Sequence, residues 1–155
     1  MSYINTATGA YPLSADEVRA DFPNTSFPDT ATAFELAIQR ESYELVHPTP
    51  MPAVDHTKTV TEGAPTEDQG IWRQAWVITD ATAEEIAERT ANQATAVRQE
   101  RNTKLSDCDW TQLADSPLDP DAKGAWALYR ETLRMVPQQL GFPWEINWPP
   151  VPGSN

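Results

Sequence analysis

Cysteine is nearly absent from this sequence, since Cys108 is the only one among 155 residues. A single cysteine cannot form a disulfide within the chain, which is typical of proteins made in a reducing cytoplasm. The six glycines are scattered, so the sequence holds no glycine-rich phosphate-binding loop. No run of about 18 apolar residues occurs, so we expect no membrane-spanning helix. The first residues also lack the basic and apolar regions of a signal peptide.

Basic residues are few as well. Eleven lysines and arginines stand against 23 aspartates and glutamates, which gives a net charge of −12 and a pI near 4.4. Such a chain repels phosphate backbones and anionic lipid headgroups, so we expect neither nucleic acid nor a membrane as a partner. The charge favours solubility and basic protein partners.

Residues that carry catalysis or bind metals are scarce and poorly spaced. The two histidines, His47 and His56, lie beside prolines and threonines, and together with Cys108 they show no ligand spacing typical of zinc sites. The aspartates within 115–121 lack the glycine and the distal glutamate of an EF-hand calcium loop. No serine or cysteine lies in a recognisable nucleophile motif. We therefore expect no metal, no cofactor and no enzymatic activity.

Two capping boxes predict short helices near the start of the chain. Ser14 and Glu17 favour a helix over about 15–20. Thr32 and Glu35 favour a second helix that continues to about residue 40.

Three segments that follow favour β-strands, over 43–46, 57–62 and 71–79. We expect a loop around Pro65, between residues 63 and 70. The 71–79 segment has apolar residues on both faces, which indicates a central position in a small antiparallel sheet.

A third capping box, formed by Thr82 and Glu85, opens a segment without helix breakers over about 81–105. The apolar side chains of this helix are mostly alanine, with Ile86, Val97 and Leu105, and so thin a stripe is difficult to bury alone. We interpret the helix as a spacer, or as one strand of an oligomeric bundle.

A compact helical unit is predicted toward the end of the chain. Asp119 is a typical N-cap, Pro120 suits the first helical position, and Pro137 ends the helix near Val136. One face of this helix is apolar and carries Ala122, Trp126, Tyr129, Leu133 and Val136. We expect the flanking segments, which carry Trp110, Leu113, Phe142, Trp144, Ile146 and Trp148, to fold back onto that face.

These patterns predict an α+β protein in three parts. Residues 1–79 form an attachment region of short helices and a small antiparallel sheet. Residues 80–105 form the connecting helix, and residues 106–152 form a small helical C-terminal module.

The C-terminal third also contains several unusual sequence motifs in a fixed order. They are CDWTQLADSPL, then W-x-x-YR-x-x-LR, then VPQQ-x-GFPW-x-x-x-WP. From about Val97 to Pro150, this order resembles the C-terminal module of the phage tail assembly chaperone family. The resemblance implies a bacteriophage protein with a role in building the tail or its fibres, and it leaves open whether the protein leaves after assembly or stays in the particle. We expect a protein that is made in the host cytoplasm, binds tail-fibre or baseplate proteins and is located in the virion tail. A homo-oligomer is a further option.

Six side chains of types enriched at binding hot spots cluster in this region: Tyr129, Arg130, Arg134, Phe142, Trp144 and Trp148. We expect them to contact a partner. A competing interpretation, which we favour for Trp110, Trp126 and Phe142, is that these rings form the core of the module.

Two roles are open for Arg130 and Arg134. They could bind carboxylates of a partner, or they could brace Asp109 and Asp115 within the module. The extended, proline-rich segment 144–152 suits pairing with a sheet edge or docking in a groove.

Three classes of function fit the sequence. The leading one is a phage tail protein that acts by protein binding, either as an assembly chaperone that leaves or as a fibre or baseplate adaptor that stays. The second is a small glycan-directed hydrolase of the tail, which needs two carboxylates about 5–10 Å apart. The third is an acidic regulator that binds a host protein.

The apolar face of the C-terminal helix generates a first prediction. We expect Trp126→Ala to lower the free energy of unfolding of the module by ~3–5 kcal/mol, the usual loss for a large buried aromatic ring. Thermal denaturation measures this effect, and a soluble variant that unfolds at the wild-type temperature would place Trp126 on the surface.

Overall fold

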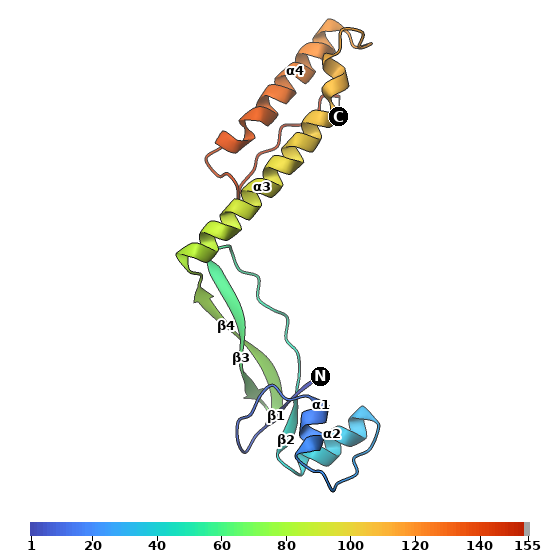
Figure 1. The fold of residues 1–155 in the computed structure, drawn as a ribbon, viewed down its shortest axis with the longest axis vertical. Coiled ribbons are helices and arrows are strands. Elements are labelled where there is room, and N and C mark those ends of the chain that lie inside the picture. Colours follow the sequence, from blue (N-terminus) through green and yellow to red (C-terminus); the bar gives the residue numbers. More distant parts are fainter. Residues whose placement is uncertain (154–155) are drawn as a thin grey trace. The chain divides into compact units, whose positions relative to one another are not determined.

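The computed structural model describes residues 1–153 and confirms an α+β fold (Figure 1). Two compact units divide the chain, the first covering Met1–Asp80 and the second beginning at Ala81. Within residues 1–153, all four strands belong to the N-terminal unit, whereas the two longest helices belong to the C-terminal unit. The roles assigned to the three parts of the chain stay a prediction.

A two-stranded ribbon and two short helices form the core of the N-terminal unit. Strand β1 (Ser2–Asn5) pairs antiparallel with β2 (Tyr43–Val46). Helices α1 (Ala15–Ala20) and α2 (Ala31–Gln39) place their apolar residues against this ribbon. The buried residues of this core are Tyr3, Val18, Phe34, Ile38 and Tyr43. The predicted capping box at Ser14 is confirmed, since Ser14 accepts from the backbone of Glu17 and Glu17 reaches back.

The predicted capping box at Thr32 is wrong. Helix α2 begins at Ala31 with Thr30 as its N-cap, and no side chain caps it. Tertiary packing accounts for the earlier start, because Phe27 meets Phe34 edge to face at 5.3 Å between ring centroids. This contact brings the chain into the helix two residues before the expected cap.

The loop predicted over 63–70 is also wrong, because a long hairpin occupies this region. Strand β3 (Lys58–Asp68) pairs antiparallel with β4 (Ile71–Asp80). Gln69 and Gly70 both have positive φ, at 52° and 81°, as a two-residue type I′ turn requires. Gly63 pairs with Ala75 but Thr66 pairs with Arg73, so β3 has one extra residue there. Pro65 lies in this bulge, where its missing N–H breaks no ladder bond.

The hairpin and the ribbon meet at His47, directly after β2. The N–H of His47 donates to Trp72 O at 2.9 Å, and the N–H of Gln74 donates to His47 O at 2.9 Å. Strand β4 therefore has β3 along one edge and His47 at the other. Thr49 continues the contact, since its hydroxyl accepts from Trp76 Nε1 at 3.0 Å. The structure thus has two antiparallel pairs joined at one bridge, instead of one three-stranded sheet.

Two antiparallel helices form the C-terminal unit. Helix α3 (Ala83–Asp107) starts from the predicted capping box at Thr82 and runs two residues past the expected end. Helix α4 (Pro120–Met135) starts from Asp119, whose carboxylate accepts from the N–H of Ala122 at 2.7 Å, as predicted. Figure 1 shows α4 running back alongside α3, followed by a tail that returns along α3. Short 3₁₀ helices, η1 (Asp109–Gln112) and η2 (Val136–Gln138), flank α4.

The apolar face of α4 is the one that the sequence predicts. Tyr129, Leu133 and Val136 are buried, and Trp126 is half-buried against them. On α3, only Ala94 and Val97 are buried within the helix, in line with its thin apolar stripe. The core of this unit is therefore concentrated between α4 and the second half of α3.

Substitution of two glycines by alanine should change the free energy of unfolding in opposite directions. Gly70→Ala should lower the free energy of unfolding by ~1–2 kcal/mol, because an L-residue is strained at positive φ. Gly124→Ala should raise it by ~0.5–1 kcal/mol, because Gly124 is inside α4 and an added Cβ there meets no atom. Chemical denaturation followed by circular dichroism measures both values, and equal effects of the two changes would contradict the turn assignment.

Candidate functional site

The end of α3 is closed by side chains as well as by backbone. The thiol of Cys108 donates toward Lys104 O at 3.1 Å and Leu105 O at 3.3 Å, which are among the carbonyls that a helix end leaves unpaired. The hydroxyl of Thr111, fully buried, donates to Cys108 O at 2.7 Å. These bonds provide donors for three carbonyls where the chain turns from α3 into η1.

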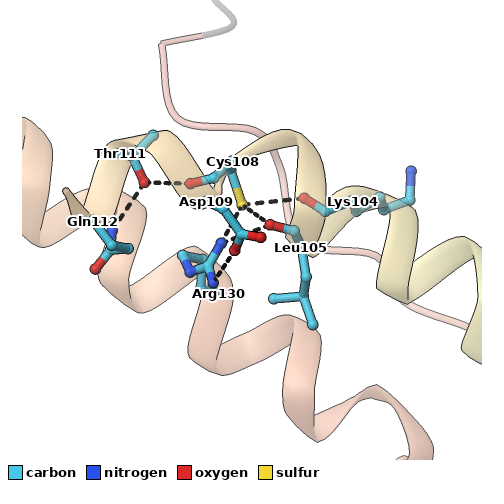
Figure 2. Close-up of polar contacts among 7 residues, drawn as sticks. All are labelled: Lys104, Leu105, Cys108, Asp109, Thr111, Gln112 and Arg130. Carbon is cyan, nitrogen blue, oxygen red and sulfur yellow. Dashed lines mark hydrogen bonds and ion pairs between the residues drawn. The ribbon is translucent and has the colours of Figure 1, made fainter. Parts of the chain in front are cut away.

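Arg130 reaches into this turn from α4 (Figure 2). Its Nη1 donates to Leu105 O at 2.7 Å and to Cys108 Sγ at 3.1 Å, while its Nη2 donates to Asp109 Oδ1 at 2.6 Å. The arginine is 8 % exposed. One guanidinium thus joins the end of α3, the start of η1 and the middle of α4, and we call these four residues the Arg130 network.

The electrostatics of the network favour a permanent positive charge. Burial alone would lower the pKa of Arg130, but its hydrogen bonds to Asp109 and Cys108 raise that pKa above its ordinary value. The charge lies at the C-terminal end of α3, where the helix dipole is negative. Asp109 keeps 65 % of its side chain exposed, so only one member of the ion pair is desolvated.

The core of the unit lies next to the network. Cys108, Tyr129 and Leu133 are buried together, with Leu105, Trp126 and Trp148 packed around them. Trp126 meets Tyr129 edge to face at 5.6 Å. Trp110 is 46 % exposed and only flanks Trp126, so its assignment to the core is wrong. Trp110 lies within the 3₁₀ helix η1, and its ring is at the rim of the core.

Two kinds of contact hold the tail (residues 139–153) in place. The side-chain amide of Gln139 donates to Asn147 O and accepts from Asn147 N–H, each at 2.9 Å. Lys104 lies over the ring of Trp148 and Arg98 over the ring of Phe142, each at 5.1 Å from the centroid. The ring contacts therefore fix the tail to α3, and the bonds between Gln139 and Asn147 close a loop within the tail.

The GFPW motif requires a glycine at its first position, because Glu145 lies very close to Gly141. An added Cβ on Gly141 would lie 2.6 Å from Glu145 Cβ and 2.8 Å from Glu145 O. The N–H groups of Trp144 and Glu145 both donate to Gly141 O, at 2.9 and 2.7 Å. A tight turn thus reverses the chain after η2.

The six predicted contact residues do not form one surface. Tyr129 and Arg130 are buried, and Phe142 and Trp148 are half-buried in the contacts described above. Arg134 and Trp144 are exposed. Of the two roles open for Arg130, the structure shows the internal brace on Asp109. Whether the six residues meet a partner stays a prediction.

Sequence reasoning missed the apolar residues that α4 turns outward. Leu128 is 66 % and Met135 49 % exposed, and Leu140, just after η2, is fully exposed. Beside them a groove of about 450 Å³ runs between α4 and the tail. It is lined by Ala125, Leu128, Tyr129, Thr132, Gln139, Asn147, Trp148, Pro149 and Pro150. The sequence did indicate this second apolar face, because Leu128 and Met135 are seven residues apart, which is two helical turns, and both fall outside the buried face.

Within residues 1–153, no group of three or more His, Cys, Asp or Glu side chains could hold a metal ion. In the same residues, no helix has the length and apolarity needed to cross a membrane.

The Arg130 network generates a third prediction. Arg130→Met should lower the free energy of unfolding by ~2–3 kcal/mol, because it removes charge-assisted hydrogen bonds and leaves Leu105 O with fewer donors. Arg130→Lys should restore only part of the loss, since lysine lacks the planar fork that reaches two acceptors. Urea denaturation measures the free energy of unfolding of the wild-type protein and of both variants.

Arg134 is the matched control, since it is one turn further along α4 and exposed. Arg134→Met should change the free energy of unfolding by less than ~0.5 kcal/mol. Equal losses for the changes at 130 and 134 would show that the buried network contributes nothing specific.

One family model matches the chain. Residues 94–153 match the family described as phage tail assembly chaperone protein. Neither a curated protein nor a solved structure matches the chain. The matched range contains the second half of α3, the Arg130 network, α4 and the tail. The family resemblance predicted from the motifs is therefore confirmed, since residues 94–153 are similar to phage tail assembly chaperone proteins.

Proposed function

We propose that this protein is an assembly chaperone for a tail-fibre or baseplate protein, which it holds through residues 108–152. The family match supports a role in tail assembly by protein binding. The observation that carries the finer proposal is the apolar groove within the matched range. Its walls are fixed before any partner arrives, so binding orders few side chains and loses little conformational entropy.

The N-terminal unit has a different task in this proposal. Residues 1–80 contain twelve acidic and four basic side chains, so most of the net charge of −12 lies there. Such a surface is suited to attachment to a basic protein, and it favours fast association by electrostatic steering. We propose that residues 1–79 supply attachment or oligomerisation, while the C-terminal unit selects the tail partner.

The hydrolase alternative receives less support from the structure. A glycosidase needs two carboxylates facing one another across a cleft. The groove beside α4 has no carboxylate in its lining, and the other four hollows described in residues 1–153 have at most one each. A binding role needs no such pair.

Deletion of residues 140–155 tests where the partner binds. The shortened protein should no longer capture the tail protein, because the deletion removes one wall of the groove. The tail proteins of the encoding phage would be co-expressed one at a time with the tagged chain, and the purified complexes identified by mass spectrometry. Capture at the wild-type level would move the contact out of the C-terminal tail.

A milder pair of variants controls for damage to the fold. Gln139→Ala removes both hydrogen bonds to Asn147 and should weaken capture, while Gln138→Ala, at an exposed neighbouring position, should not. Mass spectrometry of purified particles then separates the two forms of the role. A chaperone is absent from the particle, whereas a fibre or baseplate adaptor is present in it.

A further inference from the structure

We propose that α4 presents a docking seat for an amphipathic helix of the tail partner, and that this helix carries basic residues along its edges. The seat consists of an outer stripe, Ala125, Leu128, Thr132 and Met135, and of a tail wall, residues 148–150. This inference rests on the proposed function and specifies the structural class of the partner.

The spacing of the outer stripe is that of a helix–helix seam. Its four residues are separated by three, four and three positions, which is the a/d pattern by which one helix packs on another. Helix α4 therefore has two apolar faces. The face with Tyr129 and Leu133 is buried, whereas Leu128 and Met135 remain 66 % and 49 % exposed within residues 1–153.

Small residues permit a close approach to the first half of the stripe. Gly124 and Ala125 are both exposed, and no atom lies within 4 Å of the position that a Cβ on Gly124 would take. A partner helix could therefore contact the backbone of α4 here and insert a large side chain beside Leu128.

The tail wall favours a helix over a strand as the occupant. Pro149 and Pro150 have no N–H to donate, so a strand laid along them would leave its own carbonyls unpaired. A helix satisfies its backbone internally and needs only apolar contact from the groove. The wall is held in place by the hydrogen bonds between Gln139 and Asn147, so it does not have to be ordered on binding.

The charges beside the stripe indicate the polarity of the partner. By helical spacing, Asp121 lies one turn before Ala125, and Glu131 lies one turn after Leu128. Lys123 and Arg134 fall on the opposite side of α4 by the same spacing. The seat thus has an acidic rim, which is complementary to lysine or arginine on the partner helix.

The same rim disfavours a second copy of this chain. Two copies that paired through their outer stripes would bring Asp121 and Glu131 of one against those of the other, with no basic side chain on that side of α4. Like charges across a helix seam repel, so the stripe fits a heterologous partner better than itself.

A photo-cross-linking amino acid placed at Leu128 tests the inference in the full-length chain co-expressed with each tail protein. The same amino acid at Leu113, which is exposed in the same unit, is the matched control. We expect cross-links at 128 but not at 113, to one tail protein and within a segment that has helical apolar spacing and flanking lysine or arginine. A synthetic peptide of that segment should gain helical circular dichroism when the chain is added.

Substitution completes the test. Leu128→Glu should weaken capture by about tenfold or more, as expected for an interface hot spot, while Leu113→Glu should leave it unchanged. Both variants should keep the wild-type melting temperature, because both side chains are exposed. If Leu128→Glu captures normally while deletion of 140–155 abolishes capture, the proposed function stands and the seat is wrong. Cross-links between copies, or to a segment without helical spacing, also overturn the seat. If the wild-type chain captures no tail protein, both proposals fail.

Discussion

The guanidinium of Arg130 is the constraint on which the C-terminal unit depends. It donates to the carbonyl of Leu105 in the last turn of α3, to Asp109 in η1 and to the sulfur of Cys108. Because these groups come from three segments, the bonds fix where α3 stops and how α4 lies against it. The position of α4 then determines where the tail can return, since Trp148 packs against the same core. The groove and its walls follow from that arrangement.

The motifs shared with the family serve mainly to build this scaffold. Cys108, Arg130 and Gly141 belong to the motifs CDW, YR and GFPW, and each makes contacts within the C-terminal unit. Leu128 and Met135, which remain exposed, lie outside those motifs, whereas Trp110 and Trp144 are exposed within them.

Local signals in the sequence predicted much of the fold, and long-range contacts account for the differences. The helix starts at Thr82 and Asp119 depend on hydrogen bonds three residues away, so sequence alone is sufficient to place them. The start of α2 near Thr32 depends on ring packing, and the strand through Pro65 depends on a partner strand that absorbs the bulge. The role of Arg130 depends on a helix end 25 residues earlier in the chain, which spacing within α4 does not reveal.

Nuclear magnetic resonance of the arginine side chains in the ¹⁵N-labelled full chain tests the central claim most directly. A buried guanidinium bonded to three acceptors rotates slowly about its Cζ–N bonds, so Arg130 should give separate Nη signals that exchange slowly with water. Arg134, exposed on the same helix, should give a single averaged signal. Averaged signals from both arginines would contradict the account, because a mobile Arg130 could not hold α3, η1 and α4 together.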